Sequence, residues 1–242
     1  MTRKNRLVAS IAALLAALVI AAGLSTYDYS QAAQASSFAC PPGQYCAKAY
    51  PDPSGYGTVG DITTATVIVA GDSIANGCRH EIRSALTEAG ITSAVNYWSG
   101  RPTKPGVDWA LSLTRKPPVF VMELGSNDFA NPGVMAGEIA RLRTGLPVGT
   151  VVVWVDTYNG NQLLATGWTN NQVHASGLLV VPWYAMFAKA PWRDGYYLRD
   201  KLHPKGSVDG VTPGVGCAFL AAIMKPTIVA AVGQSKRAVA PR

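Results

Sequence analysis

Residues 64–73 read TATVIVAGDS, and this stretch decides the fold class. Residues 64–70 are all β-branched or alanine, as in a strand buried on both faces of a parallel sheet. A helical stretch from Ile74 to Ala89 follows and is closed by Gly90. A buried strand that passes through Gly71-Asp72-Ser73 directly into a helix is typical of an α/β domain.

The same alternation continues toward the C-terminus. Four further strands are predicted, at Ser93–Trp98, Val119–Leu124, Val151–Asp156 and Leu178–Val181. Helices are predicted near residues 133–144, 161–174 and 214–232, and Pro226 is expected to kink or end the last one. The pattern predicts a parallel sheet covered by helices on both faces. Ligands bind such sheets beyond the carboxyl ends of the strands, at the loops that begin here at Gly71, Ser99, Gly125 and Asp156.

The N-terminus has the features of a secretory signal peptide over residues 1–35. Arg3, Lys4 and Arg6 precede an apolar run over residues 7–24, and small residues stand at 33 and 35. The prediction is a secreted or cell-envelope protein, with no stable membrane insertion once the signal is cleaved. The competing interpretation is a single uncleaved membrane anchor, because the run approaches the length that spans a bilayer.

The remaining chain divides into three parts. Residues 36–60 are rich in Ser, Pro, Gly and Tyr, which predicts an irregular lead-in. Residues 61–232 form the predicted domain, and residues 233–242 are predicted to be a flexible tail. Apolar residues make up 48% of the sequence and charged residues 14%, which is a globular composition. Without residues 1–35 there remain 18 basic and 13 acidic residues, or +5, scattered without a basic stripe. Nucleic acid is therefore not an expected partner.

The four cysteines, Cys40, Cys46, Cys78 and Cys217, are an even number in an exported chain and suggest disulfides. Three pairings are possible. Cys40 and Cys46 bracket a turn-rich segment, so Cys40–Cys46 with Cys78–Cys217 is the preferred pairing, and unpaired buried cysteines are the alternative. No zinc-ligand spacing is present, so no metal is expected.

Three of the four candidate loops carry residues suited to acyl chemistry. Ser73 stands where strand passes into helix, a position that exposes a hydroxyl beside the N–H groups of a helix start. Asn127, in Gly125-Ser126-Asn127-Asp128, could present its side-chain amide to an oxyanion, and Gly100 could let a backbone N–H approach a ligand. Each of these loops alone is also explained as an ordinary turn.

A serine hydroxyl needs a base, and the sequence offers three histidines. His80 lies about two helical turns from Ser73, too far for a hydrogen bond. His174 has no carboxylate nearby in sequence and is interpreted as a surface or packing residue. His203 lies three residues after Asp200 in a polar loop, and a turn there would bring the carboxylate to the ring. A salt-bridged surface loop is the competing interpretation, but His203 is the best base available.

Together these motifs resemble the SGNH (GDSL-type) hydrolases. The resemblance rests on Gly-Asp-Ser after the first strand, a glycine after the second, Gly-x-Asn-Asp after the third, and Asp-x-x-His before the last helix, and it spans residues 64–224. It implies a flavodoxin-like three-layer α/β/α sandwich with a central five-stranded parallel sheet and no metal or organic cofactor.

The resemblance also implies roles for individual residues. Ser73 is the expected nucleophile, His203 the general base and Asp200 the residue that orients it. The backbone N–H groups of Ser73 and Gly100 and the side chain of Asn127 are the expected oxyanion hole, with Asp72 and Asp128 as structural supports. Ser73 is followed by Ile-Ala where many lipolytic members have Leu, so esterase is a safer expectation than lipase.

The expected activity is cleavage of acyl esters, such as O-acetyl or other short-chain esters, through an acyl-enzyme. A small-molecule or carbohydrate ester is the expected substrate, because Trp98 and Trp168 could line the site and stack on sugars, although core packing explains most tryptophans. Two alternatives remain. One is an O-acyltransferase that acts on envelope carbohydrate, and the other is a non-catalytic carbohydrate-binding module, which would not need the complete Ser-Asp-His set.

Overall fold

The computed structural model describes residues 56–128, 131, 133–188, 193–196, 200–206 and 214–239. The predicted signal peptide and the predicted Cys40–Cys46 pair lie outside the described residues. Of the predicted lead-in over residues 36–60, only the last five residues are described.

The strand predicted at the centre of the motif, β2 (Val67–Gly71), lies inside a six-stranded sheet of order β1-β3-β2-β4-β5-β6. The other strands are β1 (Tyr56–Val59), β3 (Ser93–Trp98), β4 (Val119–Glu123), β5 (Val151–Val155) and β6 (Leu179–Val181). Strands β2 to β6 pair in parallel, which confirms the five predicted parallel strands. The prediction missed β1, which pairs antiparallel with β3 at the sheet edge, where an irregular lead-in was expected.

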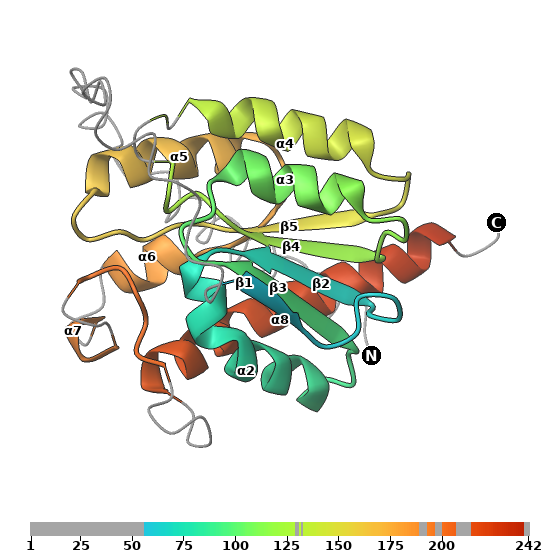
Figure 1. The fold of residues 1–242 in the computed structure, drawn as a ribbon, viewed down its shortest axis with the longest axis horizontal. Helices are drawn as coiled ribbons and strands as arrows, with labels where there is room; N and C mark the ends of the chain where they lie inside the picture. Colours follow the sequence, from blue (N-terminus) through green and yellow to red (C-terminus); the bar gives the residue numbers. More distant parts are fainter. Residues whose placement is uncertain are drawn as a thin grey trace, which may run out of the picture. The chain divides into compact units, whose positions relative to one another are not determined.

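Helices cover the sheet on both faces, so the predicted three-layer α/β/α arrangement is confirmed. Figure 1 shows α3, α4 and α5 on one face and α2 and α8 on the other. Their bounds are α2 Ser73–Glu88, α3 Thr103–Ser112, α4 Val134–Gly145, α5 Leu163–Ala175 and α8 Val215–Val239. Two short helices, α6 (Trp183–Ala188) and α7 (Arg193–Tyr196), follow β6 and were not predicted.

Each face of the sheet has its own hydrophobic core, because successive side chains of a strand point to opposite faces. In β2, Val67 and Val69 join the core beneath α2 and α8, whereas Ile68 and Ala70 join the core beneath α3, α4 and α5. All five residues of β2 are buried, as its uninterrupted apolar pattern predicted.

Helix α3 was not predicted because its sequence, TKPGVDWALS, contains helix-breaking residues at its start. Pro105 and Gly106 both stand within the first four residues of the helix. Proline is tolerated in the first turn, where the backbone N–H has no partner inside the helix. A Cβ at Gly106 would lie 2.3 Å from a methyl carbon of Leu124, so glycine lets this side chain pack closely against α3.

Helix α8 continues to Val239, so Pro226 does not end it and residues 233–239 of the predicted flexible tail are helical. By length and composition alone the helix could span a bilayer. Its buried residues Leu220, Met224 and Ile228 belong to the core that it shares with α2. A disulfide joins Cys78 of α2 to Cys217 of α8, which confirms that predicted pair.

The sheet places the predicted site loops together at the carboxyl ends of its parallel strands. Strands β2 and β4 are parallel neighbours, yet β2 leads to α2 on one face and β4 leads toward α4 on the other (Figure 1). Such a reversal is the topological switch point at which open α/β sheets bind ligands. The loops that hold Ser73 and Asn127 flank this point.

Candidate active site

The turn between β2 and α2 is built so that Ser73 becomes the first residue of the helix. Asp72 is the N-cap, and its Oδ1 accepts a hydrogen bond from the N–H of Ile74 at 2.8 Å. The lack of a side chain at Gly71 lets the end of β2 lie close to the first turn of α2, because a Cβ at this position would lie 2.3 Å from the Ala75 Cβ. The same Cβ would lie 2.9 Å from Oε2 of Glu123.

Glu123, at the end of β4, lies beneath this turn and was not singled out from the sequence. Its Oε2 accepts hydrogen bonds from the N–H groups of Ala75 at 3.1 Å and Asp72 at 3.4 Å. Burial, together with the nearby charge of Asp72, raises the pKa of Glu123 well above its ordinary value. Burial also raises the pKa of Asp72, against the hydrogen bonds from Ser126 and Ile74 and the charge of His203. The buried pair therefore favours a state in which Glu123 is protonated.

The structure brings Ser73, His203 and Asp200 into one hydrogen-bonded chain. Nε2 of His203 lies 2.8 Å from Oγ of Ser73, and Nδ1 lies 2.7 Å from Oδ2 of Asp200. With the Nδ1–H tautomer, the ring donates to Asp200 and its Nε2 accepts from the serine hydroxyl. The side chain of His203 is about one-third exposed, at 32%.

The loop that carries His203 is stabilised by hydrogen bonds within the loop and by one hydrogen bond from the loop after β5. Oδ1 of Asp200 accepts from the N–H groups of Leu202 and His203, each at 3.0 Å, which forms a tight turn. Burial alone would raise the pKa of Asp200, but these hydrogen bonds and the His203 ring hold the pKa below its ordinary value. Nδ2 of Asn161 donates to the backbone carbonyl of Asp200 at 2.6 Å, so the turn is fixed from outside as well.

Two backbone N–H groups, those of Ser73 and Gly100, are available to a bound oxygen. The N–H groups of Ser73 and Gly100 have no acceptor among the described residues, whereas those of Asp72, Ile74, Ala75 and Asn76 are all engaged. Gly100 has φ +80°, a left-handed conformation that glycine adopts without strain. Its loop is tied to α2 by the Asn76 side chain, which donates to Ser99 Oγ at 3.0 Å.

Asn127 lies between the loops after β2 and β3, and its amide group is engaged with protein oxygens. Its Nδ2 donates to Oδ2 of Asp72 at 2.8 Å and approaches the carbonyl of Arg101 at 3.3 Å. Ser126 Oγ donates to the same oxygen of Asp72. Asp72 therefore orients Asn127, as the expected structural support would.

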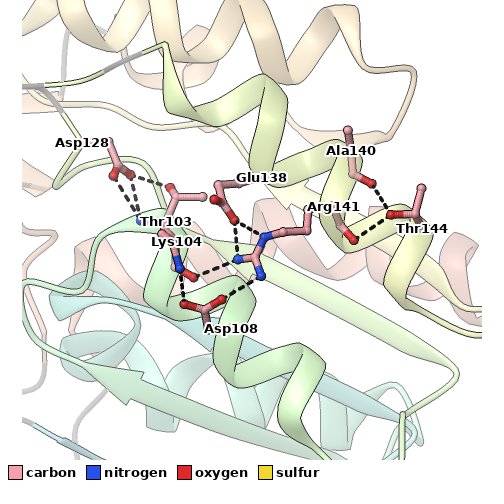
Figure 2. Close-up of polar contacts among 8 residues, drawn as sticks. All are labelled: Thr103, Lys104, Asp108, Asp128, Glu138, Ala140, Arg141 and Thr144. Carbon is pink, nitrogen blue, oxygen red and sulfur yellow. Dashed lines mark hydrogen bonds and ion pairs between the residues drawn. The ribbon is translucent and has the colours of Figure 1, made fainter.

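Asp128 joins the loop after β4 to the start of α3, as Figure 2 shows. Its carboxylate accepts hydrogen bonds from both the backbone N–H, at 2.9 Å, and the hydroxyl of Thr103. Burial raises the pKa of Asp128, although the bonds from Thr103 oppose the rise. The loops that carry Gly100 and Asn127 are thereby connected in a fixed arrangement.

The other two histidines lie outside this chain of contacts. His80 is exposed on α2. His174 does contact a carboxylate, since its Nε2 lies 3.2 Å from Oδ2 of the buried Asp156, which the sequence spacing did not indicate. Among the described residues, no group of three or more His, Cys, Asp or Glu side chains is arranged to hold a metal ion.

No protein-family model and no curated protein matches the sequence, but solved structures match the fold. A lipase/acylhydrolase from Enterococcus faecalis aligns with a TM-score of 0.55 and 17% identity, over 73% of this chain and 98% of its own. The C-terminal catalytic domain of peptidoglycan O-acetyltransferase A from Streptococcus pneumoniae aligns with a TM-score of 0.52 and 18% identity, over 71% of this chain and 94% of its own.

A carbohydrate esterase family 3 protein from Talaromyces cellulolyticus aligns with a TM-score of 0.52 and 13% identity, over 69% of this chain and 97% of its own. The chain therefore has the fold of these acylhydrolase, acetyltransferase and esterase domains. The α/β fold expected from the four motifs is therefore confirmed.

Proposed function

We propose that the protein is a serine enzyme that cleaves or transfers acyl groups of esters, with Ser73 as the nucleophile. The observation that carries the proposal is the chain of two short hydrogen bonds, 2.7 Å from Asp200 to His203 and 2.8 Å from His203 to Ser73. A serine hydroxyl becomes an effective nucleophile only when such a base removes its proton. The shared fold of the esterase and acetyltransferase domains supports the same chemistry.

In the proposed first step, Ser73 Oγ bonds to the ester carbonyl carbon while Nε2 of His203 takes the hydroxyl proton. Asp200 stabilises the resulting imidazolium. The N–H groups of Ser73 and Gly100 receive the negative oxygen of the tetrahedral intermediate, and Asn127 is the proposed third donor. Nδ2 of Asn127 has two hydrogens and contacts both Asp72 and Arg101, so donation to the oxyanion requires that the longer contact, to the Arg101 carbonyl, be given up.

The intermediate then collapses to the acyl-enzyme. The bond between the carbonyl carbon and the alcohol oxygen breaks, and the alcohol leaves with the proton from His203. In the second step His203 removes a proton from a water molecule, which attacks the acyl-enzyme and releases the acid and free Ser73. If a sugar hydroxyl replaces water in that step, the product is a new ester and the reaction is acyl transfer.

The reaction type is tested by p-nitrophenyl acetate hydrolysis. Ser73→Ala and His203→Ala are each expected to lower kcat at least about 10³-fold, because each removes one member of a unit that acts together. His80→Ala is the matched control, since His80 is an exposed histidine on the same helix as Ser73. Full activity in Ser73→Ala would exclude the assignment.

Transfer to a carbohydrate is the second candidate, favoured by the fold shared with the O-acetyltransferase catalytic domain. Incubation with an acyl donor and an oligosaccharide separates the two outcomes. New acylated sugar indicates a transferase, and free acid with unchanged sugar indicates a hydrolase. Trp168, which is 45% exposed on α5, is a candidate for stacking on a sugar ring.

We further propose that residues 1–35 direct export and are removed. The basic start, the apolar run and the small residues at 33 and 35 support this proposal. Mass spectrometry of the N-terminus after expression in a secreting host is expected to find a chain that begins near Ser36. An intact N-terminus in the membrane fraction would indicate an anchor.

A further inference from the structure

Arg101 directly follows the candidate oxyanion glycine, yet its side chain is completely buried, with 0% of its surface exposed. Among the described residues, Nη2 of its guanidinium makes one hydrogen bond, to Oδ1 of Asn96 at 2.7 Å. Nε and Nη1 are buried and have no hydrogen-bond partner among the described residues. Because burying an incompletely paired charge is unfavourable, a guanidinium in this position needs a reason beyond stability.

The guanidinium is nevertheless held firmly. Its central carbon lies 5.4 Å from the ring centre of Trp98 and 5.7 Å from that of Trp109, within the range of cation–π attraction. Asn96 is itself fixed, because its Nδ2 donates to the carbonyl of Gly57 and the hydroxyl of Thr58 in β1. The edge strand β1 therefore holds Asn96, the hydrogen-bond partner of the arginine, in place.

The backbone of Arg101 is linked to two donors of the candidate oxyanion hole, the main-chain N–H of Gly100 and the side-chain amide of Asn127. Its N–H donates to the carbonyl of Trp98 at 2.9 Å and closes the turn that places Gly100 in its left-handed conformation. Its carbonyl lies 3.3 Å from Nδ2 of Asn127. A displacement of Arg101 would therefore move Gly100 and Asn127 together.

We propose that Arg101 is a positioning residue, whose buried guanidinium fixes the Gly100 N–H and the Asn127 amide in the arrangement that receives the oxyanion. The proposal rests on the proposed function, and it adds a residue to which the motifs assign no role. Oxyanion donors accelerate acyl transfer only when they are fixed in advance, and a small misplacement lowers the rate of the chemical step.

Charge contributes to the same arrangement. Asp72, which orients Asn127, is influenced by four titratable groups: Glu123 on β4, Asp128 after β4, His203 in its loop and Arg101 after β3. Arg101 is the permanently charged cation of this set. Burial lowers the pKa of Arg101 to about 10, against the effect of Asp72, so the guanidinium stays charged at neutral pH. Without it, Asp72 would be protonated at higher pH and would hold Asn127 less well.

The test compares two variants. Arg101→Met keeps a side chain of similar length but removes the charge, and Arg101→Lys keeps the charge but removes the planar guanidinium. Using p-nitrophenyl acetate, Arg101→Met is expected to lower kcat about 10- to 100-fold while KM stays within about threefold. The acidic limb of its pH profile is expected to move to higher pH, and Arg101→Lys is expected to recover part of kcat. Arg115→Met is the control, because Arg115 binds the carbonyl of Ala65 before β2, at the other end of the strands.

A readout without turnover separates this inference from the proposed function. In a ¹⁵N NMR spectrum, the side-chain amide signal of Asn127 is expected to shift and broaden in Arg101→Met but not in Arg115→Met. An unchanged Asn127 signal together with wild-type kcat in a folded Arg101→Met would overturn the inference. If Arg101→Met does not fold, wild-type kcat and an unchanged signal in Arg101→Lys would overturn it. Activity that persists in Ser73→Ala would instead overturn the proposed function, and the Asn127 signal would still decide the role of Arg101.

Discussion

His203 Nε2 lies 2.8 Å from Ser73 Oγ, although 130 residues separate the two in the chain. The contact joins the start of α2 to the segment between α7 and α8. The carbonyl of Lys205, two residues after His203, accepts from the N–H groups of Gly216 and Cys217 at the start of α8, each at 3.1 Å. The position of the histidine therefore depends on how α8 is held against α2.

The disulfide between Cys78 and Cys217 is expected to contribute strongly to stability. It closes a loop of 139 residues, and it joins α2 to the turn of α8 that holds Lys205. The double variant Cys78→Ala, Cys217→Ala is expected to lose about 3–5 kcal/mol of unfolding free energy, as measured by urea denaturation. Its esterase activity is expected to decline at lower temperature than that of the wild type. An unchanged urea midpoint would contradict the prediction.

Gly71→Ala is expected to damage the turn before Ser73. The new Cβ would lie 2.3 Å from the Ala75 Cβ, too close for real carbon atoms, so the turn must shift. We expect a loss of about 1–3 kcal/mol in unfolding free energy and a reduced kcat. Gly137→Ala is the control, since a Cβ there meets nothing within 4 Å inside α4, and it is expected to stabilise the helix by about 0.5–1 kcal/mol.

The central strands could be predicted from the sequence because they are uninterrupted apolar runs. The loops after β2, β3 and β4 could be predicted because they begin where these runs end. Residues 67–71 are buried on both faces, and that environment selects a recognisable pattern. Strand β1 could not be predicted in this way. It is a short edge strand with alternating exposure, and its sequence, Tyr-Gly-Thr-Val, resembles the irregular segment before it.

The site was predicted where a motif marks a residue and was missed where no motif does. Ser73 begins the helix that follows β2, and Asp200 and His203 stand in a loop predicted at the same end of the strands, so the topology predicts that they meet. Glu123 is the last residue of an otherwise apolar strand, and nothing in its spacing indicates that it binds the N–H of Ala75. Arg101 was missed because arginine is ordinarily a surface residue.

Two aspartates, whose different contacts Figure 2 shows, are expected to differ sharply in their contribution to stability. Asp128 is buried and accepts two hydrogen bonds from Thr103, whereas Asp108 is 45% exposed and pairs with Lys104 and Arg141. Asp128→Ala leaves a buried N–H and hydroxyl without acceptors and is expected to cost about 2–4 kcal/mol. Asp108→Ala removes surface ion pairs and is expected to cost less than about 1 kcal/mol, with a salt-dependent effect.

Activity separates the two aspartates further. Because Asp128 joins the loop of Asn127 to the helix that follows Gly100, Asp128→Ala is expected to lower kcat in the protein that remains folded. Asp108→Ala is expected to leave kcat unchanged. Denaturation curves and p-nitrophenyl acetate kinetics of the two variants check both statements, and equal effects would show that Asp128 has no special role.

Glu123→Gln is expected to make the protein more stable at neutral and alkaline pH. Burial raises the pKa of Glu123 well above its ordinary value. In the unfolded chain the carboxyl ionises near pH 4.3, roughly the ordinary value for Glu, whereas in the folded protein it keeps its proton to higher pH. The stability that this group provides is therefore fully present below the unfolded pKa and is lost as pH rises through the folded pKa.

Glutamine resembles the protonated carboxyl, since its carbonyl can accept from Ala75 and its amide can donate, but it does not titrate. The variant should therefore match the wild type near pH 4 and exceed it by at least about 1 kcal/mol at pH 8. Glu88→Gln, at the exposed end of the same helix as Ala75, is the control and should show no such divergence. If urea denaturation gave the same difference between Glu123→Gln and wild type at both pH values, Glu123 would be ionised in the folded protein, and the turn before Ser73 would contain two negative charges.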